Sequence, residues 1–469
     1  MAKRIGFWLG LAMFALLVAL PAPAGLSPAG WRVAAVAVLM ATWWMTEALP
    51  LAATALIPFL LFPLLGTGSA NDVAASYYSP VIFLVLGGSL IALSIERVGL
   101  HRRIALAIVT RGGTSPRALL FAYMAATALV SMFVANTATA VIMLPIALAL
   151  IHAVIPDDEA MGVQRPFAAA LVLGVAYAAS LGGLGTLVGS PTNAISAGLI
   201  ERTSDIEVDF VTWASFGVPI VALSVPLAWW LLTKTLRVPA EPIDHERVLA
   251  GIGSPGPWTG SERRLVPILA ATVLAWVFLP LLRQPLGLPA IDDGMIAVAA
   301  GLLLLVAADG RGERLLTWAD TRRAPWDVLL LYGGGLALAE GITGTGLSTW
   351  MGEQLRGVGM LPVWAVALLL CGLVVLVTEF ASNVATATGF MPVIAGLTLV
   401  LGIDPALLAF PAACAASWGF MMPAGTGANA LAFATGYPTV GHFIKAGFWL
   451  DLLGVPLIVG VCFAVAAMT

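Results

Sequence analysis

Long apolar segments alternate with short polar ones along the whole chain. A helix needs ~20 mostly apolar residues to cross a bilayer, and the pattern predicts an all-α polytopic membrane protein with about 11 transmembrane helices. The segment 66–79 is polar and is expected to be a loop. Continuous spans are predicted near residues 5–22, 31–48, 50–65, 211–233, 265–285, 292–308 and 443–467, with two more that begin at Val81 and Trp326.

Two other apolar segments are too long for one span and carry polar residues at their middle. The first covers 117–155 and breaks at 134–137, and the second covers 362–400 and breaks at 382–383. Because each segment has room for two helices joined by a polar turn, each is predicted to be a re-entrant hairpin. Such a hairpin enters and leaves the membrane from the same side.

Two further spans are each interrupted by a polar run and are too short to form a two-helix hairpin. Residues 167–200 contain a run of Gly, Ser, Pro, Thr and Asn at 182–193, and residues 405–435 contain a similar run at 416–430. Unwound chain survives at membrane depth only where protein or a wet cavity satisfies its backbone groups. Two hairpin tips and two broken helices therefore predict a polar cavity inside the protein.

The hairpin and the broken span occur twice in the same order, so the chain reads as a tandem repeat. VANTATAVIMLPI at 134–146 matches the end of TEFASNVATATGFMPVI at 378–394, with Asn136 aligned on Asn383. The predicted division is an N-terminal transmembrane helix in 1–30, a first repeat in 31–235, a cytoplasmic linker in 236–264 and a second repeat in 265–469.

The first apolar run follows Lys3 and Arg4 and ends in PAPAG at 21–25. That order is also found in cleaved signal peptides. The apolar core of this run is long for a signal peptide, which favours a retained first helix.

Composition agrees with a membrane protein, because 60% of the 469 residues are hydrophobic and only 10% are charged. The net charge of −3 and the lack of a long basic run give no support for a nucleic-acid partner. No HExxH, GxSxG or Walker sequence is present, so neither an enzyme nor an ATP-driven pump is indicated. The three cysteines lie in apolar surroundings without CxxC spacing and are interpreted as core thiols: Cys371, Cys414 and Cys462.

Lys and Arg favour cytoplasmic loops, which sets the predicted orientation. With the N-terminus inside and each hairpin returning to its own side, all but four of the 22 basic residues become cytoplasmic. The same arrangement makes the two hairpins enter from opposite faces, so the repeats have inverted topology, as in many secondary transporters. The four basic residues left outside are Arg32, Arg202, Arg283 and Arg356.

The polar tips have the chemistry to bind an anion together with a cation. Helix N-termini attract anions, whereas freed carbonyl and hydroxyl oxygens suit Na⁺. Asn136 and Asn383 add amide groups, and Thr137 and Thr426 add hydroxyls. Since no Lys or Arg lies in the four motifs, a bound cation would have to balance the charge of an anion, which gives a physical basis for coupling.

Other polar and small residues have simpler interpretations. A single Asn in a membrane helix often joins two helices, but two at matched breaks favour a site. Gly87 and Gly333 are expected to allow close helix packing. Glu47 and Glu379 could carry protons, although their positions near predicted helix ends favour structural capping or a hydrogen-bond role.

These motifs resemble the divalent anion/sodium symporter family, whose members carry dicarboxylates, citrate or sulfate. The resemblance rests on WWMTEALPLAATALIPFLLFP at 43–63, on GGSLIALSIERVGLHRRIAL at 87–106, and on both tips and both breaks. It implies a scaffold domain that dimerises and a transport domain that is built from the hairpins and broken helices and slides as an elevator.

The resemblance also implies which residues bind ions and substrate. One sodium site would use Ser131, Ala135, Asn136 and Gly189, and its twin Thr378, Ala381, Asn383 and Gly425. Substrate would contact Asn136, Thr137, Ser382, Asn383, Val384 and Thr426.

This chain departs from the family pattern, which has Ser-Asn-Thr at each tip. Ala135 removes a hydroxyl beside the first cation site, and Val384 removes one beside the substrate. The second break reads Gly-Thr-Gly-Ala-Asn at 425–429, where relatives often have Thr-Pro-Pro-Asn.

The sequence thus predicts a homodimeric secondary carrier in the inner (cytoplasmic) membrane. It would couple Na⁺ entry to uptake of small divalent anions, most of all C4-dicarboxylates such as succinate, malate or fumarate. Three alternatives remain open: a cation-independent dicarboxylate exchanger, a sulfate or other oxyanion carrier, and an ion channel.

Overall fold

The computed structural model describes residues 2–155, 158–203, 206–243, 256–282, 285, 287, 291–354 and 361–468. Regular structure in these residues is helical, which confirms the all-α prediction. The first half forms α1 (Ala2–Ala19), α2 (Pro28–Thr46), α3 (Leu51–Thr54), α4 (Ile57–Leu64), α5 (Ala70–Ser76), α6 (Pro80–Val98), α7 (Leu100–Val109), α8 (Pro116–Ser131), α9 (Asn136–Val154), α10 (Asp158–Gly183), α11 (Pro191–Thr203) and α12 (Phe210–Thr235).

The second half begins after the linker. It forms α14 (Gly260–Leu282), α15 (Asp293–Val306), a short 3₁₀ turn η1 (Asp320–Arg323), α16 (Trp326–Gly344), α17 (Leu347–Gln354), α18 (Val363–Thr378), α19 (Asn383–Leu401), α20 (Pro405–Ala415), α21 (Gly427–Ala434) and α22 (Val440–Ala466).

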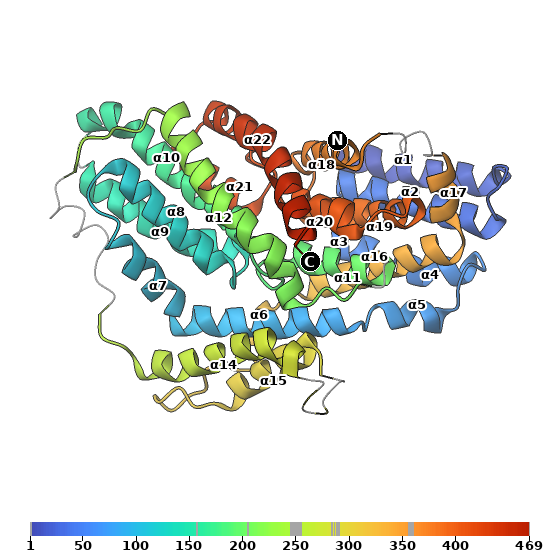
Figure 1. The fold of residues 1–469 in the computed structure, drawn as a ribbon, viewed down its shortest axis with the longest axis horizontal. Coiled ribbons are helices and arrows are strands. Elements are labelled where there is room, and N and C mark those ends of the chain that lie inside the picture. The colour runs from blue at the N-terminus through green and yellow to red at the C-terminus, as the bar shows by residue number, and fades with distance from the viewer. Residues whose placement is uncertain are drawn as a thin grey trace.

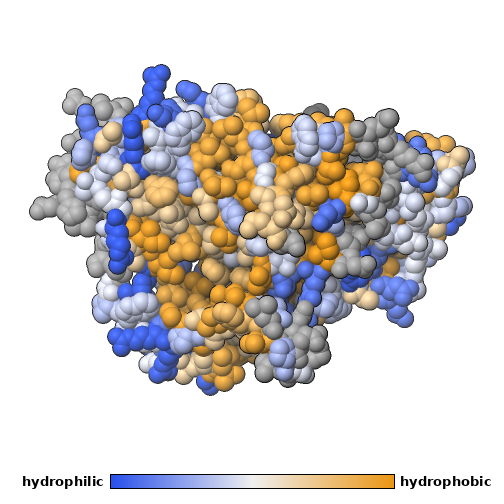
Figure 2. Space-filling view, in the orientation of Figure 1, coloured by the Kyte–Doolittle hydropathy of each residue, from blue (hydrophilic) through white to orange (hydrophobic). Residues whose placement is uncertain are grey.

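Six helical stretches in the described residues are long and apolar enough to cross a membrane. Figure 2 shows apolar side chains over the middle of one face, around α12, α20 and α22, with hydrophilic ones along the left edge where α7 and the start of α14 lie. The protein is therefore a multi-pass membrane protein. The six stretches are Ala70–Val98, Asn136–Val154, Arg165–Gly183, Phe210–Thr235, Gly260–Pro280 and Val440–Ala466.

Helix α6 runs along the molecule with α14 and α15 on one side and most other helices on the opposite side (Figure 1). It packs closely on α15 because Gly87 has no side chain. A Cβ at that position would lie 2.4 Å from the backbone carbon of Ala297. In the second half, a Cβ at Gly333 would lie 2.4 Å from the Tyr77 ring. The predicted packing role of both glycines is confirmed.

Both hairpins and both broken spans form where the sequence predicts them. The first hairpin is α8 and α9 with a turn at 132–135, and the second is α18 and α19 with a turn at 379–382. The broken spans are α10 with α11 and α20 with α21. In the second tip, the Ser382 hydroxyl accepts from the Ala385 amide at 3.2 Å, which favours the start of a new helix at Asn383.

The apolar helix predicted at 50–65 forms over Leu51–Leu64, with a two-residue turn between α3 and α4. At this turn Pro58 lacks an N–H group, and the Ala55 carbonyl accepts a 2.5 Å hydrogen bond from the Tyr77 hydroxyl. The loop predicted at 66–79 is wrong in part, because this segment contains α5, which Ser69 caps by accepting from the Asp72 amide at 3.2 Å.

Charged residues connect helix ends at one side of the protein. Arg97, at the end of α6, pairs with Asp320 at 2.9 Å, and Arg323 pairs with Glu96 at 2.6 Å. Arg103 pairs with Glu262 at 2.7 Å, so the start of α14 joins the same cluster. Three of the basic residues that are predicted to be cytoplasmic, Arg97, Arg103 and Arg323, therefore lie in one cluster.

The opposite ends of α6 and α16 carry a separate polar contact. Glu340, near the end of α16, accepts from Ser76 at 2.6 Å and pairs with Arg202. Arg202 thus lies away from the basic cluster, as the predicted orientation requires. Arg283, Arg356 and the linker residues 244–255 lie outside the described residues.

Substitution Gly87→Ala should destabilise the protein by about 1–3 kcal/mol, because the added methyl group overlaps the α15 backbone. The matched control is Gly372→Ala in α18, where nothing lies within 4 Å of an added Cβ. Thermal unfolding of the purified proteins in detergent measures both effects. An unchanged midpoint for Gly87→Ala would contradict the close α6–α15 contact.

Candidate functional site

The turn of the first hairpin lies against the break between α10 and α11. The Ser131 hydroxyl donates to the Ala179 carbonyl at 2.6 Å, and the Thr186 hydroxyl donates to the Met132 carbonyl. A hairpin tip and a broken helix thus satisfy part of each other's backbone. Unpaired carbonyl groups would be costly inside a membrane.

Oxygen atoms gather beside Gly189, in the break. A Cβ there would lie 2.6 Å from the Gly183 carbonyl oxygen, 2.9 Å from that of Met132 and 3.0 Å from that of Ser131. The Asn136 Oδ1 atom is adjacent, since a Cβ at Gly183 would lie 2.0 Å from it. Glycine at both positions therefore leaves room for a cluster of hard oxygen ligands.

Ser131 also reaches Asn136, with its hydroxyl 3.1 Å from Oδ1. A serine hydroxyl has one proton, so it can donate to the Asn136 Oδ1 or to the Ala179 carbonyl, but not fully to both. When it donates to Ala179, the Asn136 Oδ1 is available to a cation. The structure thus brings together Ser131, Asn136 and Gly189 of the predicted first sodium site.

The second hairpin repeats this geometry. The Thr378 hydroxyl lies 2.9 Å from the Asn383 Oδ1 and 2.8 Å from the Ala416 carbonyl oxygen. A Cβ at Gly425 would lie 3.3 Å from the Met422 carbonyl oxygen and 3.6 Å from that of Glu379. The carbonyl oxygens therefore lie slightly farther from the position of an added Cβ than they do in the first half.

Ala135 and Ala381 occupy the two turns. Ala135 precedes α9 and provides no side-chain cap, and it is exposed. In the second half the Ser382 hydroxyl accepts from the Ala385 amide at 3.2 Å, which caps the start of α19. Ala381 is buried, and since an alanine side chain has no oxygen, any ligand from it is its backbone carbonyl.

Each break is held by a buried asparagine that the sequence analysis did not include among the site residues. The Asn193 amide donates to the carbonyls of Gly183 at 2.7 Å and Thr186 at 2.8 Å. The Asn429 amide donates to the carbonyls of Gly419 and Met422, both at 3.2 Å. Asn193 and Asn429 occupy matching positions in the two breaks, and this repetition is the feature of the sequence that could have identified them.

Glu379 has a hydrogen-bond role, one of the two structural roles that its position predicted. Its Oε1 accepts from the Phe420 amide at 2.5 Å and the Met421 amide at 2.9 Å, and its Oε2 accepts from the Met422 amide at 2.8 Å. The side chain is only 1% exposed. Glu47 follows the end of α2 and pairs with Lys3 at 3.1 Å on the surface.

The predicted substrate residues lie in two groups. Thr137 is exposed at the start of α9 and lies against α21, since a Cβ at Gly427 would be 2.4 Å from its hydroxyl. Thr426 caps α21 by accepting from the Asn429 amide at 3.0 Å. The structure thus joins Thr137 and Thr426 from the two halves. The other group, Ser382, Asn383 and Val384, lies partly buried at the start of α19.

A cavity of about 210 Å³ leads to the first hairpin tip. Its lining includes Ala135 and Ser190 at one end and Glu96 and Arg323 from the cluster of charged helix ends. The cavity therefore gives the polar tip a route toward that side of the protein.

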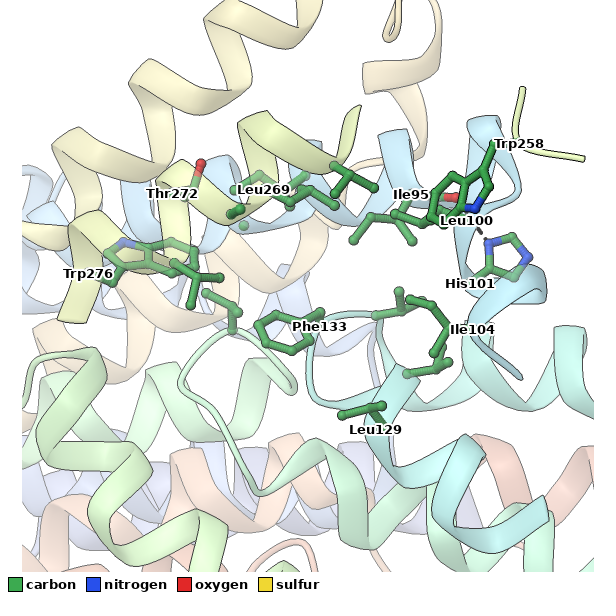
Figure 3. A pocket seen from close by; sticks show the side chains of 18 residues that line it. Ile95, Leu100, His101, Ile104, Leu129, Phe133, Trp258, Leu269, Thr272 and Trp276 are labelled. Atoms are coloured by element: carbon green, nitrogen blue, oxygen red, sulfur yellow. Dashed lines mark hydrogen bonds between the residues drawn. The ribbon is translucent and has the colours of Figure 1, made fainter. Parts of the chain in front are cut away.

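A larger cavity of about 460 Å³ lies on the other side of the tip, between Phe133 and α14 (Figure 3). Several of its polar groups bond to the backbone: the His101 Nδ1 to the Ile95 carbonyl at 3.1 Å, the Thr272 hydroxyl to the Ile268 carbonyl at 2.8 Å, and the Trp276 indole to the Asp293 carbonyl at 3.1 Å. The lining is mostly apolar, which suits an anion poorly.

Comparison with known proteins agrees with this architecture. Residues 2–467 match a family model described as "Sodium:sulfate symporter transmembrane region". The chain is 36% identical over 474 residues to the sodium-dependent dicarboxylate transporter SdcS of Staphylococcus saprophyticus, covering 97% of this chain and 90% of the relative. It is 35% identical over 473 residues to SdcS of Staphylococcus aureus strain USA300, covering 99% and 91%.

Among solved structures, MtrF of Neisseria gonorrhoeae, described as illuminating a class of antimetabolite efflux pumps, aligns with a TM-score of 0.54 at 15% identity. The alignment covers 98% of this chain and 93% of that one, and at this identity it shows the fold alone. The family assignment rests on the family model, which matches nearly the whole chain, and this family consists of transporters, not enzymes. The chain belongs to the sodium:sulfate symporter family of membrane transporters, the divalent anion/sodium symporter family that its motifs resemble.

Proposed function

We propose that this protein is a secondary carrier that couples Na⁺ entry to uptake of C4-dicarboxylates such as succinate, malate or fumarate. The observation that carries the proposal is the duplicated hydroxyl–asparagine pair, Ser131 with Asn136 and Thr378 with Asn383, each beside a glycine surrounded by carbonyl oxygens. The names of the two staphylococcal relatives support both the ion and the substrate class.

In this proposal each oxygen cluster binds one Na⁺. Hard oxygen ligands from carbonyls, hydroxyls and amides suit this ion. The first site uses Ser131, Ala135, Asn136 and Gly189. The second uses Thr378, Ala381, Asn383 and Gly425.

The dicarboxylate then binds between the two ions. Helices α9 and α19 begin at Asn136 and Asn383, so their N-terminal amides favour negative charge at the tips. Thr137 and Thr426 contribute hydroxyls, Ser382 a further one, and Val384 an apolar contact. With no Lys or Arg in these motifs, the two Na⁺ ions lower the cost of bringing a divalent anion to the site, and this links the two binding events.

The proposed transport cycle is an elevator movement of the hairpins and broken helices against a scaffold. The repeats 31–235 and 265–469 would have inverted topology, with the N-terminus and the linker 236–264 in the cytoplasm. The grouping of charged helix ends around Arg97 supports that orientation. A homodimer in the inner membrane follows the family pattern.

A second candidate is a dicarboxylate exchanger that needs no cation. Ala135 favours it, because this residue offers the first ion only a backbone oxygen. A sulfate or other oxyanion carrier would use the same helix N-termini, and the exposed hydroxyl of Thr137 would suit it equally.

Uptake of labelled succinate into proteoliposomes tests the proposal. An inward Na⁺ gradient should drive accumulation above the equilibrium level, whereas an equal K⁺ gradient should not. Uptake only into vesicles preloaded with dicarboxylate would replace the symporter by the exchanger. Transport of labelled sulfate in place of succinate would change the substrate class.

Substitution Asn136→Ala or Asn383→Ala should reduce Na⁺-driven uptake to background, because each removes the side chain shared by an ion site and the substrate. The matched control is Asn71→Ala on the exposed face of α5. Membrane insertion should be unchanged in all three, as judged by purified yield and gel filtration. Undiminished uptake by both tip variants would refute the proposed site.

Substitution Ala135→Ser should lower the half-saturating Na⁺ concentration, by about fivefold if the new hydroxyl contributes ~1 kcal/mol to ion binding. The residue would also cap α9, as Ser382 caps α19. Ala138→Ser, one turn along α9, controls for added polarity in the same cavity. A Na⁺ response that stays at the wild-type value would remove position 135 from the ion site.

A further inference from the structure

The apolar cavity beside Phe133 reaches the outer surface of the protein. It lies among α6, α7, α14 and the turn of the first hairpin, with Trp258 and Trp276 at opposite ends (Figure 3). Two of its lining side chains, Leu129 and Trp258, are 43% and 48% exposed. Helix α14 is a candidate membrane span and only 17% of its apolar window is buried, so membrane lipid has access to this opening.

The cavity has the depth and chemistry of a site for one acyl chain. Its volume is about 460 Å³, and its lining is mostly aliphatic and aromatic. From Val266 to Trp276 the lining follows α14 for about 15 Å, which is half of the ~30 Å hydrocarbon core of a bilayer. Side chains around an empty space lose dispersion contacts, so an apolar occupant from one leaflet is favoured.

The end of the cavity at Trp258 has the features of a membrane–water interface. The amphipathic ring of tryptophan favours the level of the lipid headgroups. The Arg103 guanidinium carbon lies 4.6 Å from the centroid of the Trp258 ring, and Arg103 also pairs with Glu262 at 2.7 Å. A lipid that entered here would therefore have its headgroup beside charged side chains and its chain in the cavity.

Positive charge prevails around this end of the cavity. The segments 100–111 and 258–266 contain five arginines and a single acid, Glu262, which is paired with Arg103. Arg263 is exposed and forms no ion pair with any residue that the structure describes. It shares one face of α14 with Val266 and Ala270, which both line the cavity. The charge of Arg263 is therefore available to an anionic headgroup one turn from the apolar space.

We propose that an anionic phospholipid binds at this place, with one acyl chain in the cavity and its phosphate beside Arg263 and Trp258. A guanidinium forms charge-assisted hydrogen bonds with phosphate, and the indole N–H is a further donor. Basic pockets between membrane helices are typical sites for acidic lipid headgroups. A zwitterionic lipid would fill the cavity equally well but would gain less from the excess of arginine.

The acyl chain would pack against the first hairpin and its neighbouring break. Phe133 lines the cavity from the turn of the hairpin, and Val188 lines it from the break. These two residues adjoin Met132 and Gly189, whose surroundings form the first oxygen cluster. The lipid would thus support the apolar side of the turn and stabilise the folded protein, as any ligand of the folded state does.

Two substitutions separate the chain from the headgroup. Val273→Trp fills the cavity, because Val273 is part of its lining, and Leu274→Trp is the matched control at the next residue, which is 54% exposed and does not line the cavity. Arg263→Gln removes the proposed phosphate partner. Its control is Arg322→Gln in η1, where an equally exposed arginine lies outside the lining.

Native mass spectrometry of the purified protein, titrated with phosphatidylglycerol or phosphatidylcholine, measures lipid binding directly. Wild type and both controls should bind phosphatidylglycerol at a saturable site, and more tightly than phosphatidylcholine. Val273→Trp should lose this site. Arg263→Gln should weaken it about fivefold, which corresponds to ~1 kcal/mol for one arginine near a membrane surface.

Equal binding of phosphatidylglycerol by wild type and Val273→Trp would overturn the site, and equal affinity of wild type for the two lipids would overturn the anionic headgroup. Glycerol 3-phosphate has a phosphate without acyl chains and should not compete; competition would replace the lipid by a soluble anion. If Val273→Trp does not fold, Arg263→Gln still tests the site, since this side chain is exposed. These measurements use neither Na⁺ nor succinate, so their outcome is independent of the proposed transport function.

Discussion

Unwound backbone at membrane depth must be satisfied by the protein, and this constraint organises both halves of the chain. In each half, a hydroxyl at the end of the first hairpin helix bonds a carbonyl of the neighbouring broken helix: Ser131 to Ala179 and Thr378 to Ala416. A buried asparagine then holds the break itself. The tips and the breaks therefore stabilise each other, and removing one leaves the other with unpaired backbone groups.

The two halves solve the same problem with different side chains. In the first, the Thr186 hydroxyl bonds the Met132 carbonyl, and the break stays polar. In the second half, Met422 occupies the position that matches Thr186 and has no hydroxyl. There the Glu379 carboxylate connects the tip to the break instead, because it accepts hydrogen bonds from three backbone amides. Among the described residues, the second half thus has a buried acidic side chain that the first half lacks.

The positions of the four polar breaks could be predicted from the sequence, because residues such as Gly, Pro, Ser and Asn act locally to end a helix. The sequence was insufficient for the division of α3 from α4, which depends on the Tyr77 hydroxyl reaching the Ala55 carbonyl from another element.

The Ser131 and Thr378 hydroxyls each have one proton and two acceptors, which would give the proposed sodium sites a simple switch. Without an ion, the Thr378 proton can be shared with the Asn383 Oδ1. A cation that took that Oδ1 would move the proton fully to the Ala416 carbonyl and strengthen the contact between hairpin and broken helix. Ion binding would therefore tighten the same contact that positions the start of α19 for the anion. Coupling in this protein can arise from one hydrogen bond in each half changing its acceptor.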